Sequence, residues 1–255
     1  MSKQVPAPAE GTAEALPPAP WQRTPQRAVK RRRDPITQEE IVETALRILD
    51  SEGLEGLSMR RIAEELDTGA ASLYWHVGSK DGLLDLLFDR VIGEQQVPDP
   101  DPARWQEQLK QVARLQRATI LRHRDIVAVS LGRIPMGPNA LRFSEGVLAI
   151  LRAGGVPDDL AVSVHLLLIA VVNGFTLDET ADEQPGSEAA APSAEAARDY
   201  IAALPQAQFP NLTAVAGQYA GVDRDERFEL LLDLFVGGLA RRAADEKRPE
   251  VGLSR

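Results

Sequence analysis

The stretch Ser58–Asp81, SMRRIAEELDTGAASLYWHVGSKD, decides the fold because its pattern predicts two short helices joined by a tight turn. Its first half begins with a serine, a residue type that caps helix N-termini, and continues with apolar residues at helical spacing. We expect the turn at residues 67–69, where Gly69 tolerates the left-handed backbone that ends a helix. The second helix then covers Ala70–Val77, so the pattern predicts a helical hairpin.

Steps of about 100° per residue divide the second helix into two unlike faces. The inner face carries apolar residues: Ala70, Leu73 and Val77. The outer face carries aromatic, small and polar residues: Ala71, Ser72, Tyr74, Trp75 and His76. A structural helix normally buries such aromatics, so their outward position favours contact with a flat, polar ligand such as a nucleic-acid groove. The alternative interpretation is a surface hairpin without a ligand.

Composition limits the classes of protein that the 255 residues can form. A hydrophobic content of 44% supports real cores, in one large or two modest domains. Cysteine is absent, which excludes disulfides and cysteine chemistry and agrees with a reducing cytoplasm. No continuous apolar run reaches the roughly 18 residues of a membrane span, and the Pro/Ala-rich N-terminus lacks the apolar segment of a secretory signal. We therefore expect no membrane partner.

The chain is acidic overall but basic near its N-terminus. A net charge of −9, taken globally, argues against nucleic-acid binding. Charges act over a Debye length of about 8–10 Å, however, so their distribution matters more than their sum. Residues 21–33 hold six basic side chains and no acid. We predict that residues 1–33 form a disordered basic arm that contacts phosphates, with a merely solvated tail as the alternative.

Capping and proline signals divide the rest of the chain into two predicted domains. Thr37 and Glu40 form a capping-box pattern that opens a first domain at residues 34–97. Its predicted helices cover residues 38–52, 59–66 and 70–77, followed by a linking helix that begins at Lys80. The run PDPDP at 98–102 denies helix continuation, so the domain boundary falls there.

A larger helical body is predicted over residues 98–246. Within it, the acidic, Ala/Pro/Ser-rich residues 182–193 predict a mobile loop, and residues 247–255 predict a disordered tail. No long alternating β pattern occurs, so we expect about nine or ten helices and no sheet.

The run Gly53–Ser58, followed by SLYWHVGSKDGLLDLL at 72–87, resembles the helix-turn-helix of TetR (tetracycline repressor) family regulators. It is especially similar to the tetracycline-repressor C-terminal-domain subgroup. The resemblance implies an all-α fold with an N-terminal three-helix helix-turn-helix DNA-binding domain and a larger helical ligand-binding and dimerisation domain. It also implies a ligand-responsive, cytoplasmic transcriptional repressor that binds a palindromic operator as a homodimer and is released by a small-molecule effector. Efflux, resistance or secondary-metabolism genes would be the regulated targets.

The resemblance places DNA contacts at the starts of helices and along the second helix of the hairpin. The expected contacts are Thr37, Arg60, Arg61, Ser72, Tyr74, Trp75, His76 and Lys80. Either Arg60 or Arg61 is expected to read a guanine, since arginine pairs bidentately with its major-groove edge. Residues 68–71 depart from the tetracycline repressor's own turn and early recognition helix, so that repressor's operator cannot be carried over.

Dimerisation is expected because a single head reads too few base pairs to find a site in a genome. The two most apolar body helices, predicted at residues 160–179 and 223–244, are the candidates for a four-helix-bundle interface. Their apolar faces could equally belong to the internal core of one chain.

The expected effector site lies between the helices of the body. Candidate lining residues are His123, Arg133, Ile134, Met136, Phe143, Val147, His165, Asn173, Phe175 and Thr176. His165 has the alternative role of an ordinary core histidine. Ser130 and Gly174 stand where the tetracycline repressor carries drug-facing histidines, so we expect neither metal nor cofactor, and a hydrophobic drug or natural product as effector.

Two other classes of protein compete with a regulator. An all-α enzyme is disfavoured because the three histidines are widely separated and no metal-spaced His/Glu pair or nucleophile elbow is present, so we expect no catalytic residue. The other rival is a helical small-molecule-binding protein without DNA activity.

Overall fold

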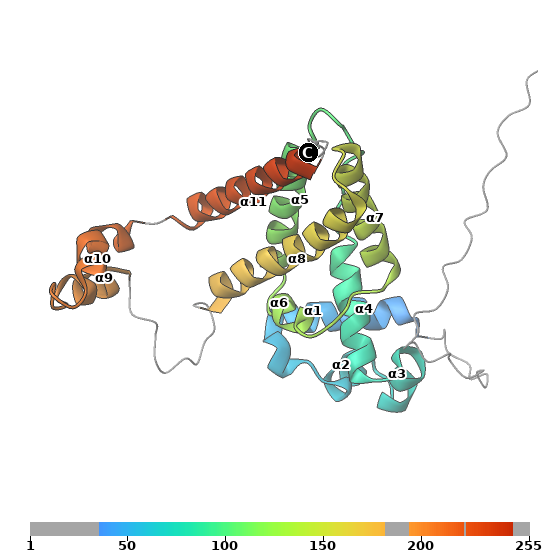
Figure 1. Cartoon of the computed structure of the whole chain (residues 1–255). Helices are drawn as coiled ribbons and strands as arrows, with labels where there is room; N and C mark the ends of the chain where they lie inside the picture. The colour runs from blue at the N-terminus through green and yellow to red at the C-terminus, as the bar shows by residue number, and fades with distance from the viewer. Residues whose placement is uncertain (1–35, 182–193, 222, 247–255) are drawn as a thin grey trace, which may run out of the picture.

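The computed structural model describes residues 36–181, 194–221 and 223–246. Every regular element in these ranges is a helix, which confirms the all-α prediction (Figure 1). The helices are α1 (Gln38–Gly56), α2 (Met59–Glu65), α3 (Ala70–Val77), α4 (Lys80–Ile92), α5 (Trp105–Arg122), α6 (Ile126–Ser130), α7 (Pro138–Ala153), α8 (Asp158–Ala181), α9 (Ala194–Ala202), α10 (Pro210–Val215), the 3₁₀ helix η1 (Ala216–Ala220) and α11 (Arg224–Glu246). The predicted basic arm, mobile loop and tail lie outside the described residues.

The head consists of α1, α2 and α3, whose buried residues belong to a core that continues through α4 into the body. The predicted capping box is present at the start of α1, where Thr37 and Glu40 exchange side-chain and backbone hydrogen bonds. Fully buried Leu49, Ile62 and Leu73 bring one apolar face from each helix together. The head therefore holds α3 through the packing of its neighbours, with the opposite face of α3 turned outward.

The hairpin turn differs from the prediction in one backbone detail. Gly69 has a φ of −86°, whereas Asp67 has a φ of +47° and supplies the left-handed residue after α2. Aspartate is one of the few side chains that enter this region readily, because its short carboxylate can bond to nearby backbone. Gly69 instead stands in extended conformation as the N-cap of α3.

Helix α4 joins the head to the body and is buried on several sides. Its Leu83, Leu87 and Val91 expose 1% or less of their surface. The helix contacts α1 and α3 in the head and α5, α6 and α7 in the body. This confirms the prediction that a helix apolar nearly all round touches both domains.

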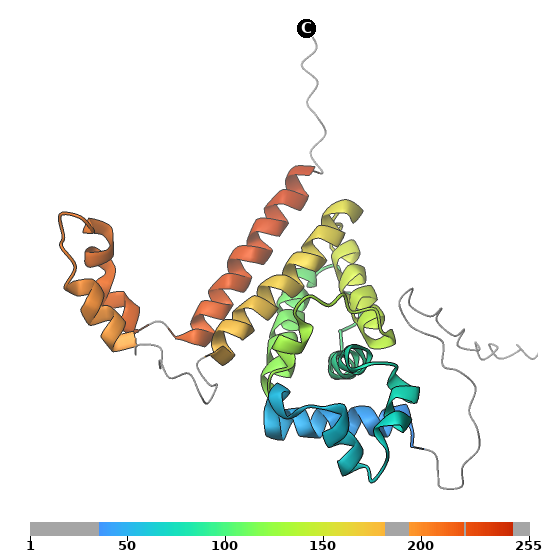
Figure 2. The same ribbon diagram turned by 90° about the horizontal axis from the view of Figure 1, so that it is seen from below.

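The body is built from α5, α7 and α8, with α11 packed along α5 and α8 (Figures 1 and 2). The short α6, which the sequence did not predict, contacts α4 and α8 beneath this bundle. Its five residues follow Asp125, which has a φ of +56°. The Asp125 carboxylate accepts a hydrogen bond from the Leu54 N–H of the head at 2.9 Å.

Helices α9, α10 and η1 pack on one another and stand clear of the bundle (Figures 1 and 2). Large apolar side chains of this unit are exposed, including Tyr200 at 70%. Sequence reasoning predicted a helix at 194–204 but left residues 205–221 unassigned.

Helix α8 is long and apolar enough, between Asp158 and Thr180, to pass a length-and-composition test for a membrane span. A search for continuous apolar runs did not find this segment, because His165 and Asn173 interrupt the run although its mean hydropathy stays high. One third of its most apolar window is buried, and the helix packs on α5, α7 and α11. One such helix is therefore weak support for a membrane span.

Candidate functional site

The outward face of α3 displays aromatic side chains on an otherwise ordinary helical head. Tyr74 and Trp75 expose 47% and 42% of their surfaces, while Leu73 and Val77 are buried on the opposite face. This is the division of faces that the sequence predicts. No acidic residue occurs from Ala70 to Lys80, so the face can approach a polyanion without like-charge repulsion.

Two contacts fix the C-terminal end of α3. The Gln38 side chain of α1 donates a hydrogen bond to the His76 carbonyl at 2.9 Å. The rings of Trp75 and His76 meet edge to face, with centroids 4.5 Å apart. Burial lowers the pKa of His76 below its ordinary value, so its ring is neutral near pH 7 and can act as a hydrogen-bonding group but not as a cation.

The two arginines of α2 have different surroundings. Arg61 makes ion pairs of 2.8 Å with Glu52 of α1 and with Glu65, and so clamps α2 against α1. Arg60 pairs at 2.8 Å with Glu64 alone among the contacts described, and 89% of its side chain is exposed. Of the two candidate guanine readers, Arg60 has the more accessible guanidinium group.

Thr37 and Lys80 mark the exposed starts of α1 and α4. The Thr37 hydroxyl accepts the Glu40 N–H at 3.1 Å, so it serves the capping box before it can serve DNA. Ser79 caps α4 by accepting the Gly82 N–H at 2.9 Å, and Lys80 beside it is exposed. Ser72, also exposed, lies on the outer face of α3.

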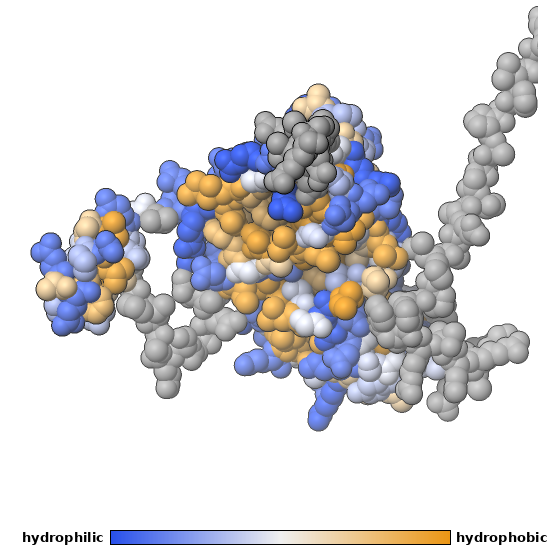
Figure 3. All heavy atoms as spheres, in the orientation of Figure 1, coloured by the Kyte–Doolittle hydropathy of each residue, from blue (hydrophilic) through white to orange (hydrophobic). Residues whose placement is uncertain are grey.

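An apolar surface extends across α8 and α11 (Figure 3). We call it the α8/α11 face; its large exposed residues are Val162, Leu166 and Leu167 of α8 and Leu230 and Leu234 of α11. Small residues lie among them, and a Cβ added at Gly174 or Gly237 would meet nothing within 4 Å. The face therefore has room for another helix to approach closely.

Three of the predicted effector residues lie on the loop between α6 and α7, at the surface. Arg133 binds α4, with ion pairs of 3.0 Å to Asp81 and 2.7 Å to Asp85. Ile134 and Met136 expose 73% and 41% of their surfaces. This loop is therefore fastened to the linking helix and is not enclosed in the body.

A chain of buried polar side chains crosses the interior of the body. Gln116 of α5 donates to the Asn173 side-chain oxygen of α8 at 2.8 Å, and Asn173 donates to the Ser130 hydroxyl of α6 at 3.4 Å. Gln116 is 5% exposed, and its side-chain oxygen has no hydrogen-bond partner. The sequence analysis missed Gln116, although a glutamine on the apolar stripe of an amphipathic helix was a usable signal.

His165 of α8 is buried, and its two ring nitrogens have different surroundings. Nε2 lies 3.0 Å from the Ser144 hydroxyl of α7, whereas Nδ1 is buried without a partner. Burial lowers the pKa of His165, which keeps the ring neutral near pH 7. The alternative of an ordinary core histidine thus accounts for one ring nitrogen and leaves the other without a hydrogen bond.

The remaining interior candidates are packed into the core in this conformation. Val147 and Thr176 have no exposed surface, and the Thr176 hydroxyl bonds within its own helix to the Val172 carbonyl at 2.8 Å. Phe143 is 7% exposed, and Phe175 packs on the ring of Phe228 with centroids 5.1 Å apart. Val147 and Thr176 line neither of the two hollows that flank α7, and their place in an effector site stays a prediction.

Two hollows flank α7. A groove of about 640 Å³ runs between α7 and α8, with Leu148 and Val162 among its lining residues. A smaller hollow of about 260 Å³ lies between the end of α4 and α7, lined by Gln95, Arg142 and Phe143 among others. Phe143 is the one predicted effector residue that lines either of these two hollows.

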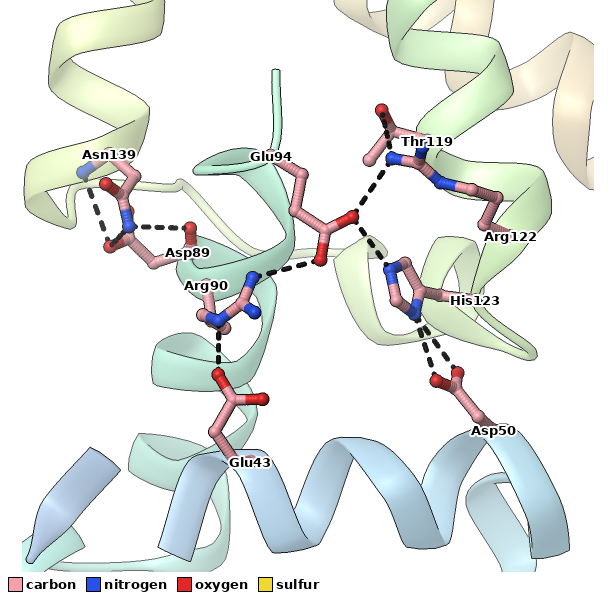
Figure 4. A network of polar contacts seen from close by, with 9 residues as sticks. All are labelled: Glu43, Asp50, Asp89, Arg90, Glu94, Thr119, Arg122, His123 and Asn139. Carbon is pink, nitrogen blue, oxygen red and sulfur yellow. Dashed lines mark hydrogen bonds and ion pairs between the residues drawn. The ribbon is translucent and has the colours of Figure 1, made fainter. Parts of the chain in front are cut away.

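His123 connects head and body and does not lie among the interior effector candidates (Figure 4). It caps the C-terminus of α5, and its ring lies 3.1 Å from Asp50 of α1 and 3.2 Å from Glu94 after α4. Burial alone would raise the pKa of Glu94, but hydrogen bonds from His123 and Arg90 outweigh it and hold that pKa below its ordinary value. The sequence predicted His123 as an effector-site residue but could not show that the end of α5 lies against α1.

Comparison with known proteins follows the same division into head and body. A family model for bacterial regulatory proteins of the tetR family matches residues 41–87, and a model for the tetracyclin repressor-like C-terminal domain matches residues 97–243. The chain belongs to the TetR family. It is therefore a DNA-binding transcriptional repressor of the effector-responsive kind, and the family resemblance predicted from residues 53–87 is confirmed.

Several TetR-family relatives cover most of the chain. An HTH-type transcriptional regulator of Saccharopolyspora erythraea is 34% identical over 92% of this chain and 97% of its own. The HTH-type transcriptional repressor DrrR1 of Streptomyces coeruleorubidus is 33% identical over 80% and 77%. Apo ActR of Streptomyces coelicolor is 43% identical, covers 84% of this chain and 99% of its own, and superimposes with a TM-score of 0.78. ActR has also been solved in complex with actinorhodin.

Proposed function

We propose that this TetR-family repressor binds a palindromic operator as a homodimer through α3 and releases it when a small molecule enters the body. The observation that carries the proposal is the exposed, acid-free aromatic face of α3, presented by a head whose other large apolar residues are buried or half-buried. A purely structural helix would have no reason to leave Tyr74 and Trp75 in solvent.

DNA reading is assigned to side chains by their exposure. The Tyr74 hydroxyl and the Trp75 indole N–H donate to phosphate oxygens, and the Tyr74 ring meets a thymine methyl group. Ser72 and neutral His76 supply short hydrogen-bonding groups, while Arg60, the more exposed of the two candidate arginines, reads a guanine. Thr37 and Lys80 add contacts to the backbone from the N-terminal ends of their helices.

The homodimer interface is assigned to the α8/α11 face. Exposed leucines on two adjacent helices form an apolar surface of the kind that marks a protein–protein interface. A second copy, related by a two-fold axis, would cover this surface with its own α8 and α11 in a four-helix bundle. Such a dimer places two copies of α3 on half-sites about 34–36 Å apart. Burial in the dimer interface accounts for the apolar face of α8 without a membrane. The protein then acts in the cytoplasm, where its DNA lies.

The effector site is placed around the interior polar groups of the body. Gln116, Asn173 and His165 present hydrogen-bonding groups within an apolar bundle, and both Gln116 and His165 keep one unpartnered atom. A mostly apolar molecule with a few polar substituents fits such a lining. ActR, which binds actinorhodin, supports a natural product of this kind, and an efflux, resistance or secondary-metabolism gene as the regulated target.

Release of DNA follows from the attachment of α4 to the body. Arg133 holds the loop after α6 to the first turns of α4, so an effector that moves this loop tilts α4 and with it the head. The dimer has two conformations that differ in the distance between its heads. An effector can shift the protein from one to the other only as far as its affinity for the two conformations differs.

A gel-shift experiment with the DNA upstream of the protein's own gene tests this function. We expect wild-type protein to shift the fragment and actinorhodin, used as the probe effector, to reverse the shift. Actinorhodin binding without any DNA shift would favour the rival small-molecule-binding protein, and failure of both would refute the proposal.

A further inference from the structure

One buried carboxylate links α4 to the start of α7. Asp89 of α4 is 8% exposed and accepts the Ala140 N–H at 2.9 Å, the Asn139 N–H at 3.3 Å and the Asn139 side-chain N–H at 3.1 Å. The same Asn139 side chain also donates to the Asp89 carbonyl at 3.1 Å (Figure 4). We call this set of hydrogen bonds the α4/α7 joint.

The joint gives α7 the N-terminal cap that its own sequence lacks. Gly137 occupies the N-cap position and has no side chain, and Pro138 at the first helical position has no N–H. The next two backbone N–H groups of α7 both point to the Asp89 carboxylate. A negative charge at this end of a helix is also favoured by the helix dipole. The start of α7 is therefore completed by a residue of α4.

Two glycines show how closely the joint is packed. A Cβ added at Gly137 would lie 2.2 Å from the Asp89 carboxylate carbon, and one added at Gly93 would lie 2.8 Å from the Asn139 side-chain nitrogen. Sliding α7 along α4 would therefore break the hydrogen bonds and leave a carboxylate buried without partners. Because an unsatisfied buried charge is costly, the joint holds as a unit or opens as a unit.

The residue next to Asp89 connects α4 to the head. Arg90 forms ion pairs with Glu43 of α1 and, at 2.9 Å, with Glu94. Adjacent residues of α4 thus bind opposite partners, with α7 of the body on one side and α1 of the head on the other. A rotation of α4 imposed at the joint is transmitted directly to α1, which carries α3.

We propose that Asp89 is a positioning residue that sets the spacing of the two DNA-reading heads by fixing α4 to the start of α7. This inference rests on the proposed dimeric repressor, and it adds a control point outside the effector-binding residues and the loop of Arg133. The 260 Å³ hollow beside the joint, which Gly93 and Asn139 help to line, leaves space into which the start of α7 can move.

The test measures the distance between heads in the full-length dimer. The native chain has no cysteine, so Glu55→Cys at the exposed end of α1 gives one nitroxide label per protomer. Electron–electron double resonance then reports the inter-head distance distribution. Asp89→Asn removes the charge and replaces an acceptor by a donor, Gly137→Ala forces the joint apart, and Asn139→Ala removes only the side-chain bonds. Asp99→Asn, exposed, and Gly217→Ala, whose added Cβ meets nothing within 4 Å, are the matched controls.

We expect the three joint variants to broaden the distance distribution, with Asn139→Ala mildest, and to weaken binding of the upstream DNA by about 5- to 150-fold. Circular dichroism and sedimentation establish that each variant compared is a folded dimer, and the mild Asn139→Ala keeps the test available if a stronger variant unfolds. A wild-type distance distribution in the folded joint variants would overturn the inference. The distance measurement needs no DNA. If the wild-type protein does not bind the upstream DNA, the proposed function is refuted, but the distance measurement still tests the joint.

Discussion

Leu166→Ala tests the assignment of the α8/α11 face to a homodimer interface. Leu166 exposes 61% of its surface in the single chain, and the dimer would cover it. The substitution removes three carbon groups worth about 0.8 kcal/mol each, so covering about six-tenths of the side chain contributes roughly 1.5 kcal/mol per copy. A two-fold symmetric dimer contains the substitution twice, so the interface loses about 3 kcal/mol. This loss corresponds to roughly a 100-fold rise in the dimer dissociation constant.

Sedimentation equilibrium across a range of protein concentrations measures this constant directly. Leu131→Ala is the matched control, because Leu131 is the same residue type, exposes 58% of its surface and lies outside the α8/α11 face. We expect the control to dimerise like the wild type. Equal dissociation constants for both variants, or a wild-type chain that stays monomeric at micromolar concentration, would contradict the assigned interface.

Three further predictions concern stability and the basic arm. Because burial lowers the pKa of His165 in the folded state, the unfolded chain takes up the proton first as pH falls below about 6.5, and the free energy of unfolding should fall with it. In urea titrations, His165→Gln should make this pH dependence flatter. An unchanged pH dependence would contradict the prediction. Gly53→Ala should cost about 1–3 kcal/mol in the same titrations, because Gly53 has a φ of +77° and its added Cβ would lie 2.8 Å from Asp125, whereas Gly217→Ala should cost little. Deleting residues 1–33 should weaken DNA binding and flatten its dependence on log salt concentration, and an unchanged slope would remove the arm from the mechanism.

Much of the fold could be predicted because local signals and periodicity agree. The Thr37 capping box and the two faces of α3 follow from residue spacing alone and appear in the structure. Separate family models match residues 41–87 of the head and residues 97–243 of the body. The turn before α3 lies where predicted, but its left-handed residue was misassigned, because glycine usually takes that conformation and here Asp67 does.

The surroundings of the candidate effector residues could not be predicted, because they depend on contacts distant in sequence. His123 was separated from the interior site by its pairing with Asp50, 73 positions earlier in the chain. Asp89 was not singled out at all, since only the three-dimensional structure shows it capping the start of α7. Val147 and Thr176 lie on the helices predicted to line the site, but their side chains are fully buried in this conformation.

The most direct test of the central claim is the affinity of wild-type and Tyr74→Ala protein for the upstream DNA, measured by fluorescence anisotropy. Tyr74 exposes 47% of its surface on the outer face of α3, so its loss should scarcely change the melting temperature. Tight, saturable binding of two protomers per palindrome by the wild type, lost in Tyr74→Ala, is the predicted result. Equal affinity of the two folded proteins for this DNA would contradict the claim that α3 reads the operator.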